Sequence, residues 1–531
     1  MKKILIILML FLVASAFAQD DKQKNPGVEL PDFVITGKEN VSIQNSSKIK
    51  PDFVPIISEE FIKPIFSPEQ LETKDLSNPV KEEINLFDSL NFYKGRLKVG
   101  AGLYTLPEAQ VSLWQPFSSG LFNAGLSAYN KRAYVENSDR FGVRANASIN
   151  YFVDADSKFL PGSELKVEGS YGINSYKLFA SDFPTVRRSF GLGNASLQFN
   201  YLTSKILISS IKIEDEFASL NDVTYSENII KFSGMSKLQL SNFAVGAHAK
   251  LISASLNNSI FSNAKFGFAN IRPFIGLNMS DAFKATFGMD FEFYESKTIF
   301  NPYASIGIKL DKSISLFAEY APHTEFSSVS SFLKQNGYLQ ADSSVGLFFD
   351  KRSSFRGVVK YEYGKYFEID GGFEYTSSSN YPYFVPAATN GEFTLVSTDA
   401  KRFEGFINLL FHSGPYGMFY GSVHFSDTRD TVNNILPYSP ALTANLNYSI
   451  NFNKKYNAGV TVEFISGGYT DLTNIKKVDG LFDLGLNFGY RINEKFVWTL
   501  EAHNLINRNN YIWNGYKEFP MDIAAGFKYQ W

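Results

Sequence analysis

The feature that most limits how this chain can fold is an alternation of apolar and polar residues that recurs between Gly95 and Trp531. It continues over segments of about 9 to 14 residues, and a tilted strand needs about 9 to 11 residues to cross a bilayer. The side chains of a strand point alternately to its two faces. The sequence therefore predicts a long series of strands, each with one apolar and one polar face.

One segment illustrates the pattern. Its apolar face comprises Phe283, Ala285, Phe287, Met289, Phe291 and Phe293, and its polar face comprises Lys284, Thr286, Gly288, Asp290 and Glu292. Segments 442–452, 482–491 and 523–531 alternate in the same way. In water, so much apolar surface could be buried only against a second sheet of matching area, whereas lipid covers it directly. We therefore expect an all-β protein, a transmembrane antiparallel β-barrel over residues 95–531.

The spacing of the turns sets the expected number of strands. Short turns such as Asp311-Lys312 alternate with longer polar loops such as 326–350 and 378–400. In outer-membrane barrels the short turns are periplasmic and the long loops extracellular. Strands that run toward the long loops are expected to begin near residues 97, 120, 163, 205, 243, 282, 313, 366, 415, 455 and 495, and the returning strands near 107, 140, 189, 227, 262, 298, 354, 401, 440, 480 and 522. This predicts about 22 strands, within a range of about 20 to 24, and two periplasmic termini.

The composition excludes several kinds of chemistry. The chain of 531 residues contains no Cys, which excludes disulfides, Cys-ligated metals and Cys nucleophiles. Its 51 Lys and Arg residues are balanced by 53 Asp and Glu residues without a basic block, which argues against nucleic acid as a partner. The five histidines are scattered without the spacing of metal ligands. We predict no catalytic residue, no metal site and no cofactor, so the protein is not expected to be an enzyme.

The N-terminus has the organisation of an export signal. Lys2 and Lys3 precede an apolar stretch over residues 4–17, and Ala16-Phe17-Ala18 supplies small residues at a cleavage site. This predicts a secretory signal peptide over residues 1–18. An uncleaved anchor would need about 20 apolar residues, more than the roughly 14 present. An exported barrel is expected in the outer membrane of a Gram-negative-type cell, with lipid as its surroundings.

The C-terminal part of the chain resembles a known family. Residues 436–441, Leu-Pro-Tyr-Ser-Pro-Ala, lead into one alternating segment, and residues 484–491 form another. Together with the Asn-Leu-Ile-Asn run at 504–507, these stretches resemble the closing strands of TonB-dependent receptors. One additional residue separates Asn507 from the following Tyr511. The resemblance is specific over residues 436–531 and weaker over 95–435, and it implies an outer-membrane transport barrel.

The chain ends in an aromatic strand. Phe527, Tyr529 and Trp531 lie on one face of the last alternating segment. This ending is similar to the last strand that the barrel assembly machinery recognises in outer-membrane proteins. We therefore predict that these three residues act as the assembly signal and that this machinery is a partner.

An extended segment, residues 19–94, precedes the barrel. Its stretch 28–37 resembles a TonB box, with Asp32, Phe33, Val34, Ile35 and Thr36 as the expected partner-binding residues. An unpaired strand there could add to the sheet edge of a TonB-type energising protein through main-chain hydrogen bonds. The alternative is an unstructured tail with one apolar patch.

The receptors also carry a plug domain in the lumen, and residues 38–95 are too short to supply one. In this chain, the prolines at positions 51, 55, 64, 68 and 79 would interrupt a sheet. We therefore expect a receptor-like barrel without a plug, which passes or takes up a solute that the sequence does not identify. Two alternatives stay open: a passive porin-like channel, and a scaffold that docks a partner without transporting.

Overall fold

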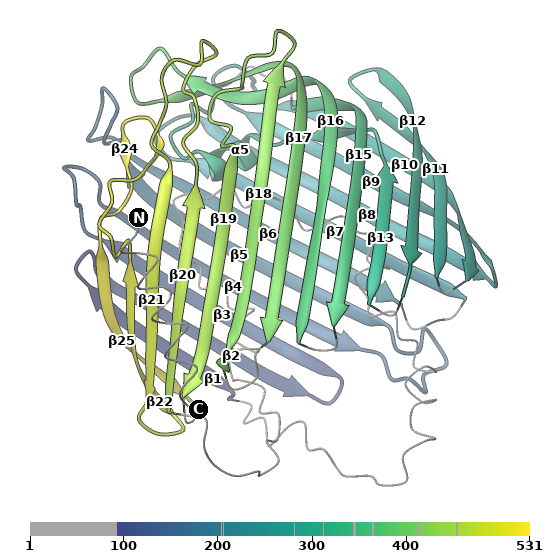
Figure 1. Ribbon diagram of the computed structural model, residues 1–531, viewed down its shortest axis with the longest axis horizontal. Helices are drawn as coiled ribbons and strands as arrows, with labels where there is room; N and C mark the ends of the chain where they lie inside the picture. The colour runs from purple at the N-terminus through teal and green to yellow at the C-terminus, as the bar shows by residue number, and fades with distance from the viewer. Residues whose placement is uncertain are drawn as a thin grey trace. The chain divides into compact units, whose positions relative to one another are not determined.

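A computed structural model describes residues 93–531, except 203, 205, 281, 312, 343–346, 364–365, 413–415 and 453–454. These residues belong to one compact unit. Their strands pair in chain order, each antiparallel to the next, and the first strand pairs with the last. β13 and β14 pair with the same neighbour, β15, and form one interrupted strand, so the sheet is a closed barrel of 22 strands (Figure 1). The predicted fold class is confirmed.

The barrel strands are β1 Gly95–Gly102, β2 Thr105–Phe117, β3 Gly120–Lys131, β4 Arg140–Phe152, β5 Glu164–Lys177, β6 Arg187–Tyr201, β7 Leu207–Leu220, β8 Tyr225–Leu240, β9 Phe243–Asn257, β10 Ala264–Ser280, β11 Phe283–Tyr294, β12 Lys297–Lys309, β13 Ile314–Tyr320, β14 His323–Phe326, β15 Phe348–Tyr363, β16 Phe367–Pro386, β17 Phe393–His412, β18 Met418–Asp430, β19 Leu442–Phe452, β20 Tyr456–Ile465, β21 Leu481–Arg491, β22 Phe496–His503 and β25 Asp522–Gln530. A short helix, α5 Val329–Gln335, lies between β14 and β15, and a small hairpin of β23 Tyr511–Trp513 and β24 Tyr516–Lys517 lies between β22 and β25.

Most strands begin within a few residues of the predicted positions. The larger differences occur at β15 and β17, which begin at Phe348 and Phe393 rather than near 354 and 401. The loop expected at 378–400 is therefore mostly strand, because β16 and β17 stay paired as far as Pro386 and Phe393. Each of these strands has 20 residues, which is about twice what a bilayer requires.

The barrel has two distinct ends. At one end the strands are joined mostly by short turns, and both Gly95 and Trp531 lie there; we call it the turn end. At the opposite loop end, long connections such as 431–441, 466–480 and 504–521 join the strands. One connection at the turn end, residues 153–163, is longer than its neighbours, which the sequence did not lead us to expect.

The first and last strands close the barrel. They pair antiparallel from Arg96 opposite Gln530 to Gly102 opposite Ala524. The main-chain oxygen of Trp531 accepts the N–H of Lys94 (2.6 Å) and of Gly95 (3.1 Å). The Trp531 ring lies against Gly95, where a Cβ atom would meet a ring carbon at 2.2 Å. A residue without a side chain is therefore required at Gly95 for the chain to close in this way.

The two faces of the barrel wall differ as the alternation predicted. On β11, Phe287, Met289 and Phe293 are exposed by 43–47% on the outer face, whereas the inward Asp290 and Glu292 are completely buried. An apolar outer surface is the arrangement that lipid stabilises. Among the described residues, no helix is long and apolar enough to cross a membrane.

The orientation of β19 gives a test of the lipid-facing surface. Leu446 lies on the apolar face near the middle of the strand, and Asn447 lies on the polar face, where its amide donates to Asn445 Oδ1 (2.7 Å). We expect Leu446→Arg to cost about 2–4 kcal/mol of folding free energy in bilayers, because a cation at mid-membrane loses its hydration. Asn447→Arg should be tolerated. Urea titration of refolded protein in liposomes measures both, and equal losses would contradict the assigned faces.

Candidate functional site

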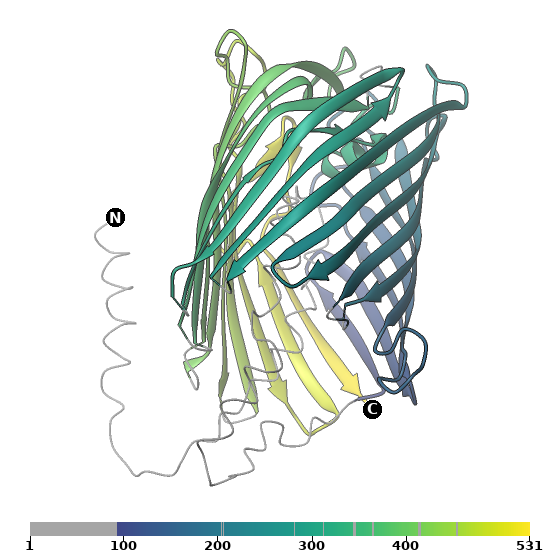
Figure 2. The ribbon, with the colours of Figure 1, turned by 90° about the vertical axis from the view of Figure 1, so that its right-hand side faces the viewer.

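The connection between β14 and β15 folds into the barrel instead of projecting from it. We call its described residues, 327–342 and 347, the inner segment. It contains α5, which lies between the barrel walls near the loop end in both views (Figures 1 and 2). The segment leaves and rejoins the wall at one place, because Ser327 N–H donates to the oxygen of Leu347 (2.8 Å). The lumen is therefore occupied at this end by a part of the barrel's own chain.

Local sequence explains why the inner segment begins as a helix. Ser328 is the N-cap, and its hydroxyl accepts the N–H of Ser331 (3.1 Å). Lys334 lies in the last turn, where a cation interacts favourably with the helix dipole, and the helix ends at Gln335 with Asn336 as its C-cap. Seven residues are too few for a stable isolated helix, so α5 depends on its packing against the wall.

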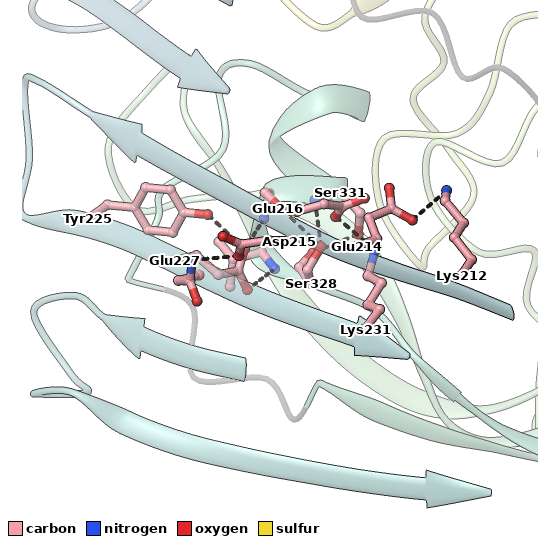
Figure 3. A network of polar contacts seen from close by, with 12 residues as sticks. Lys212, Glu214, Asp215, Glu216, Tyr225, Glu227, Lys231, Ser328 and Ser331 are labelled. Atoms are coloured by element: carbon pink, nitrogen blue, oxygen red, sulfur yellow. Dashed lines mark hydrogen bonds and ion pairs between the residues drawn. The ribbon is translucent and has the colours of Figure 1, made fainter. Parts of the chain in front are cut away.

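A buried carboxylate on β8 holds the start of α5 (Figure 3). Glu227 is 3% exposed, and its two oxygens accept the N–H groups of Val329 (3.2 Å) and Ser330 (2.8 Å). The Tyr225 hydroxyl donates to the same carboxylate (3.0 Å). A negative charge at the first turn is stabilised both by these bonds and by the helix dipole. Glu227 is thus fixed to the inner segment through main-chain atoms.

A buried cation on β6 holds the end of the same stretch. Arg188 is 2% exposed, and its Nε donates to Asp222 (2.8 Å). Its Nη1 donates to the carbonyl oxygens of Gly337 (3.1 Å) and Leu339 (2.8 Å). The planar guanidinium presents several donors in a fixed geometry, so one side chain can satisfy two carbonyls and a carboxylate.

Three further contacts attach the inner segment to its surroundings. Phe393 of β17 donates its N–H to the oxygen of Tyr338 (3.1 Å) and accepts the N–H of Gln340 (2.8 Å). Asn258 donates to the oxygen of Ala341 (2.8 Å). The rings of Tyr338 and Tyr516 stack with centroids 3.4 Å apart. Burial raises the pKa of both tyrosines above the usual range, so this pair is uncharged at neutral pH.

The side chains of the inner segment form an apolar cluster with the wall. Its members from the segment are Val329, Phe332, Leu333, Leu339, Ala341 and Leu347, and those from the wall and other connections include Phe190, Ile229, Leu256, Phe268, Phe384 and Trp513. These partners come from β6, β8, β9, β10, β16 and the β23 hairpin. The cluster therefore joins the inner segment to two parts of the wall, the consecutive strands β6 to β10 and the strand β16.

Elsewhere, charged side chains of the polar faces pair with one another. Lys98 lies between Glu108 and Glu501 at 2.9 Å from each, across the seam between the first and last strands. Lys212 pairs with Glu214 (2.7 Å), and Lys231 with Glu216 (2.8 Å), below α5 (Figure 3). The described residues contain no group of His, Asp and Glu side chains that could hold a metal ion. These ion pairs lie on the polar face of the wall.

The structure describes some of the site residues predicted from the sequence and not others. The TonB-box-like residues Asp32 to Thr36 lie outside the described residues, as do residues 38–92, from which the absence of a plug was inferred. Phe527, Tyr529 and Trp531 lie on the outer face beside the seam, where Tyr529 and Trp531 stack (5.6 Å). Their role in assembly stays a prediction.

Sequence reasoning missed the inner segment, because residues 326–350 were expected to be a polar outer loop. A signal was present in the sequence. Phe332, Leu333 and Leu339 are apolar within that polar stretch, and Ser328 precedes them as a possible helix cap. Large apolar side chains within a long loop indicate that the loop packs against something, although they do not identify what.

Comparisons with known proteins place this fold in a class. No family model and no curated protein sequence matches the chain. Solved structures do match, at low sequence identity. The FrpB iron transporter of Neisseria meningitidis, in its apoprotein form, superposes with a TM-score of 0.62 at 9% identity, over 83% of this chain and 81% of that chain.

Two other structures give similar values. The copper transporter OprC has a TM-score of 0.58 at 10% identity, covering 82% of each chain. The pyoverdine receptor FpvA of Pseudomonas aeruginosa has a TM-score of 0.59 at 12% identity, over 83% of this chain and 78% of that chain. The class is therefore that of large closed transmembrane β-barrels. Within it, the fold is that of the TonB-dependent receptor barrels, as the C-terminal sequence indicated.

The buried carboxylate of Glu227 gives a test of how the inner segment is held. Glu227→Gln keeps one acceptor oxygen but turns an NH2 group toward an N–H of the first turn, which should loosen the segment by about 1–3 kcal/mol. Hydrogen exchange of residues 329–341 should then become faster, while the barrel strands keep their protection. Glu168→Gln is the control, because Glu168 pairs with Lys166 on a partly exposed part of the wall. Similar exchange in both variants would contradict the anchoring role.

Proposed function

We propose that this protein is an outer-membrane transport barrel whose loop end is closed by its own inner segment. The observation that carries the proposal is the apolar cluster that joins Leu333 and Leu339 of the inner segment to wall residues of β8, β9 and β16. A solute that enters from the loop end must displace this segment. The likeness to an iron transporter, a copper transporter and a pyoverdine receptor supports a transport role, and it does not identify the solute.

The long connections support an orientation in which the loop end faces outward. The turn end, with Gly95, then faces the periplasm, and so does the N-terminal segment that precedes it. A TonB-type protein could reach that segment from this side. An energised barrel and a passive channel both fit the fold, but a passive channel would need an open path past the inner segment.

Conductance in planar lipid bilayers distinguishes these functions. We expect the mature protein to conduct little, and a variant in which residues 328–341 are replaced by an equal length of Gly and Ser to show a large, steady conductance. Lys334→Ser is the matched control, because Lys334 is the exposed residue of α5, and it should conduct little. A third variant lacking residues 19–94 reports on the N-terminal segment.

Each result has a definite meaning. Conductance of the mature protein equal to that of the Gly and Ser variant would show that the inner segment does not close the barrel and would favour a passive porin-like channel. Conductance that appears only without residues 19–94 would assign the closure to the N-terminal segment. No conductance in any variant would favour the docking scaffold.

The TonB-box-like stretch calls for a separate test of energised transport. If Phe33 to Thr36 pairs with a periplasmic partner as an added strand, Val34→Pro should abolish the contact, because proline lacks the N–H that the pairing needs. Thr36→Ala leaves the main chain intact and should weaken it only slightly. Site-specific cross-linking from position 33 to TonB-like proteins measures both. An adduct of equal yield in the Val34→Pro variant would exclude the strand-addition model.

A further inference from the structure

The wall recognises the main chain of the inner segment. Glu227 accepts two successive N–H groups, Arg188 donates to two carbonyl oxygens, and Asn258 donates to a third. Phe393 adds a two-bond bridge to residues 338 and 340. These atoms are present in every polypeptide, whatever its sequence. The contacts therefore select a peptide backbone rather than the particular side chains of this segment.

The apolar side chains supply the second part of such a site. Val329, Phe332, Leu333 and Leu339 are buried in the same apolar cluster as wall residues such as Ile229 and Leu256. Proteins that bind peptides commonly obtain affinity from main-chain hydrogen bonds and selectivity from contacts with side chains. The lumen wall at this level provides main-chain hydrogen bonds and apolar contacts for side chains.

The charges of Glu227 and Arg188 define the direction in which a peptide chain would bind to the site. Along the inner segment, Glu227 holds the N-terminal part and Arg188 holds the C-terminal part. A free peptide bound in the same direction would bring its ammonium group toward the carboxylate and its carboxylate toward the guanidinium. Both wall groups are 2–3% exposed while the segment is bound. Arg188 keeps its bond to Asp222 and Glu227 its bond to Tyr225 when the segment departs, but the Nη1 donors of Arg188 and the acceptor positions of Glu227 that the main chain had filled become available to a zwitterionic peptide.

We propose that the wall around Arg188, Glu227, Asn258 and Phe393 is a peptide-binding site that the inner segment occupies in the closed barrel. The proposal rests on the proposed transport function and names its solute class: short apolar peptides, which compete with the inner segment for the same groups. The segment then acts as a built-in competitor of the solute.

The chain's own sequence supplies the probe. The protein is the full chain in which residues 328–341 are replaced by Gly and Ser, and the ligand is a synthetic peptide with the sequence of residues 328–341. We expect this peptide to lower the bilayer conductance of the variant at least tenfold in a saturable manner. A scrambled peptide of the same composition should have at least tenfold lower affinity. Fluorescence anisotropy of the labelled peptide on detergent-solubilised variant measures the same affinity without conductance.

Substitutions in the wall locate the site. In the same background, Glu227→Gln and Asn258→Leu should each lower the affinity for the peptide at least fivefold, and Glu168→Gln should leave it unchanged. The two wall variants are independent, so the site remains testable if one of them does not fold. Heat-modifiable mobility on gels shows which variants have folded.

The outcomes separate this inference from the proposed function. Conductance without block, together with no anisotropy change at millimolar peptide, would overturn the peptide site and leave the closure by the inner segment intact. Equal affinity for the scrambled peptide, or affinity unaffected by both wall substitutions, would also overturn it. If the Gly and Ser variant does not conduct but binds the peptide with the expected selectivity, the transport proposal fails and the site stands.

Discussion

The structure depends on one constraint, which is that a sheet in lipid can leave no edge unpaired. Main-chain N–H and C=O groups have no water to bond within the hydrocarbon, so the first strand must pair with the last. β1 and β25 meet this requirement, and Gly95 admits the Trp531 ring at the point of closure. On the inner side of the seam, Lys98 links β1 to both Glu108 and Glu501. Closure therefore leaves every strand paired on both sides, and the alternation along each strand decides which side chains face the lumen.

A barrel of 22 strands encloses more space than its inward side chains can fill, and barrels of this size hold additional polypeptide in the lumen. Here the connection between β14 and β15 supplies it near the loop end. Such a filling must be attached from several directions, because an apolar contact on one side alone would leave water on the other. Arg188 and Glu227 attach the inner segment from the nearby strands β6 and β8, and Phe393 attaches it from β17, in another part of the barrel.

The sequence predicted the wall of the barrel well and the segment inside it poorly. The reason is how far apart in the sequence the interacting residues lie. A strand crossing the bilayer reveals itself through alternation among adjacent residues, so even β11, with its buried Asp290 and Glu292, was assigned correctly. The boundaries of β16 and β17 were misplaced because their paired ends beyond the bilayer no longer need an apolar face. The inner segment is held by contacts between residues far apart in sequence, such as Arg188 and Gly337, 149 positions apart. No local pattern encodes such a contact.

The balance of forces at the inner segment bears on how it could move. Each hydrogen bond to the wall contributes about 0.5–1.5 kcal/mol when exchanged for water, but a buried charge that loses its partners without gaining water costs several times as much. Glu227 and Arg188 can therefore release the segment only as water or a polar ligand reaches them. The apolar cluster that includes α5 buries Leu333 and Leu339 beside these groups. The opening proposed above would therefore be cooperative, because the apolar side chains would separate from the wall in the same step in which the charged groups find new partners. A ligand that brings its own donors and acceptors lowers the cost of that step, whereas a change in solvent alone leaves the two charges to be hydrated in a narrow lumen.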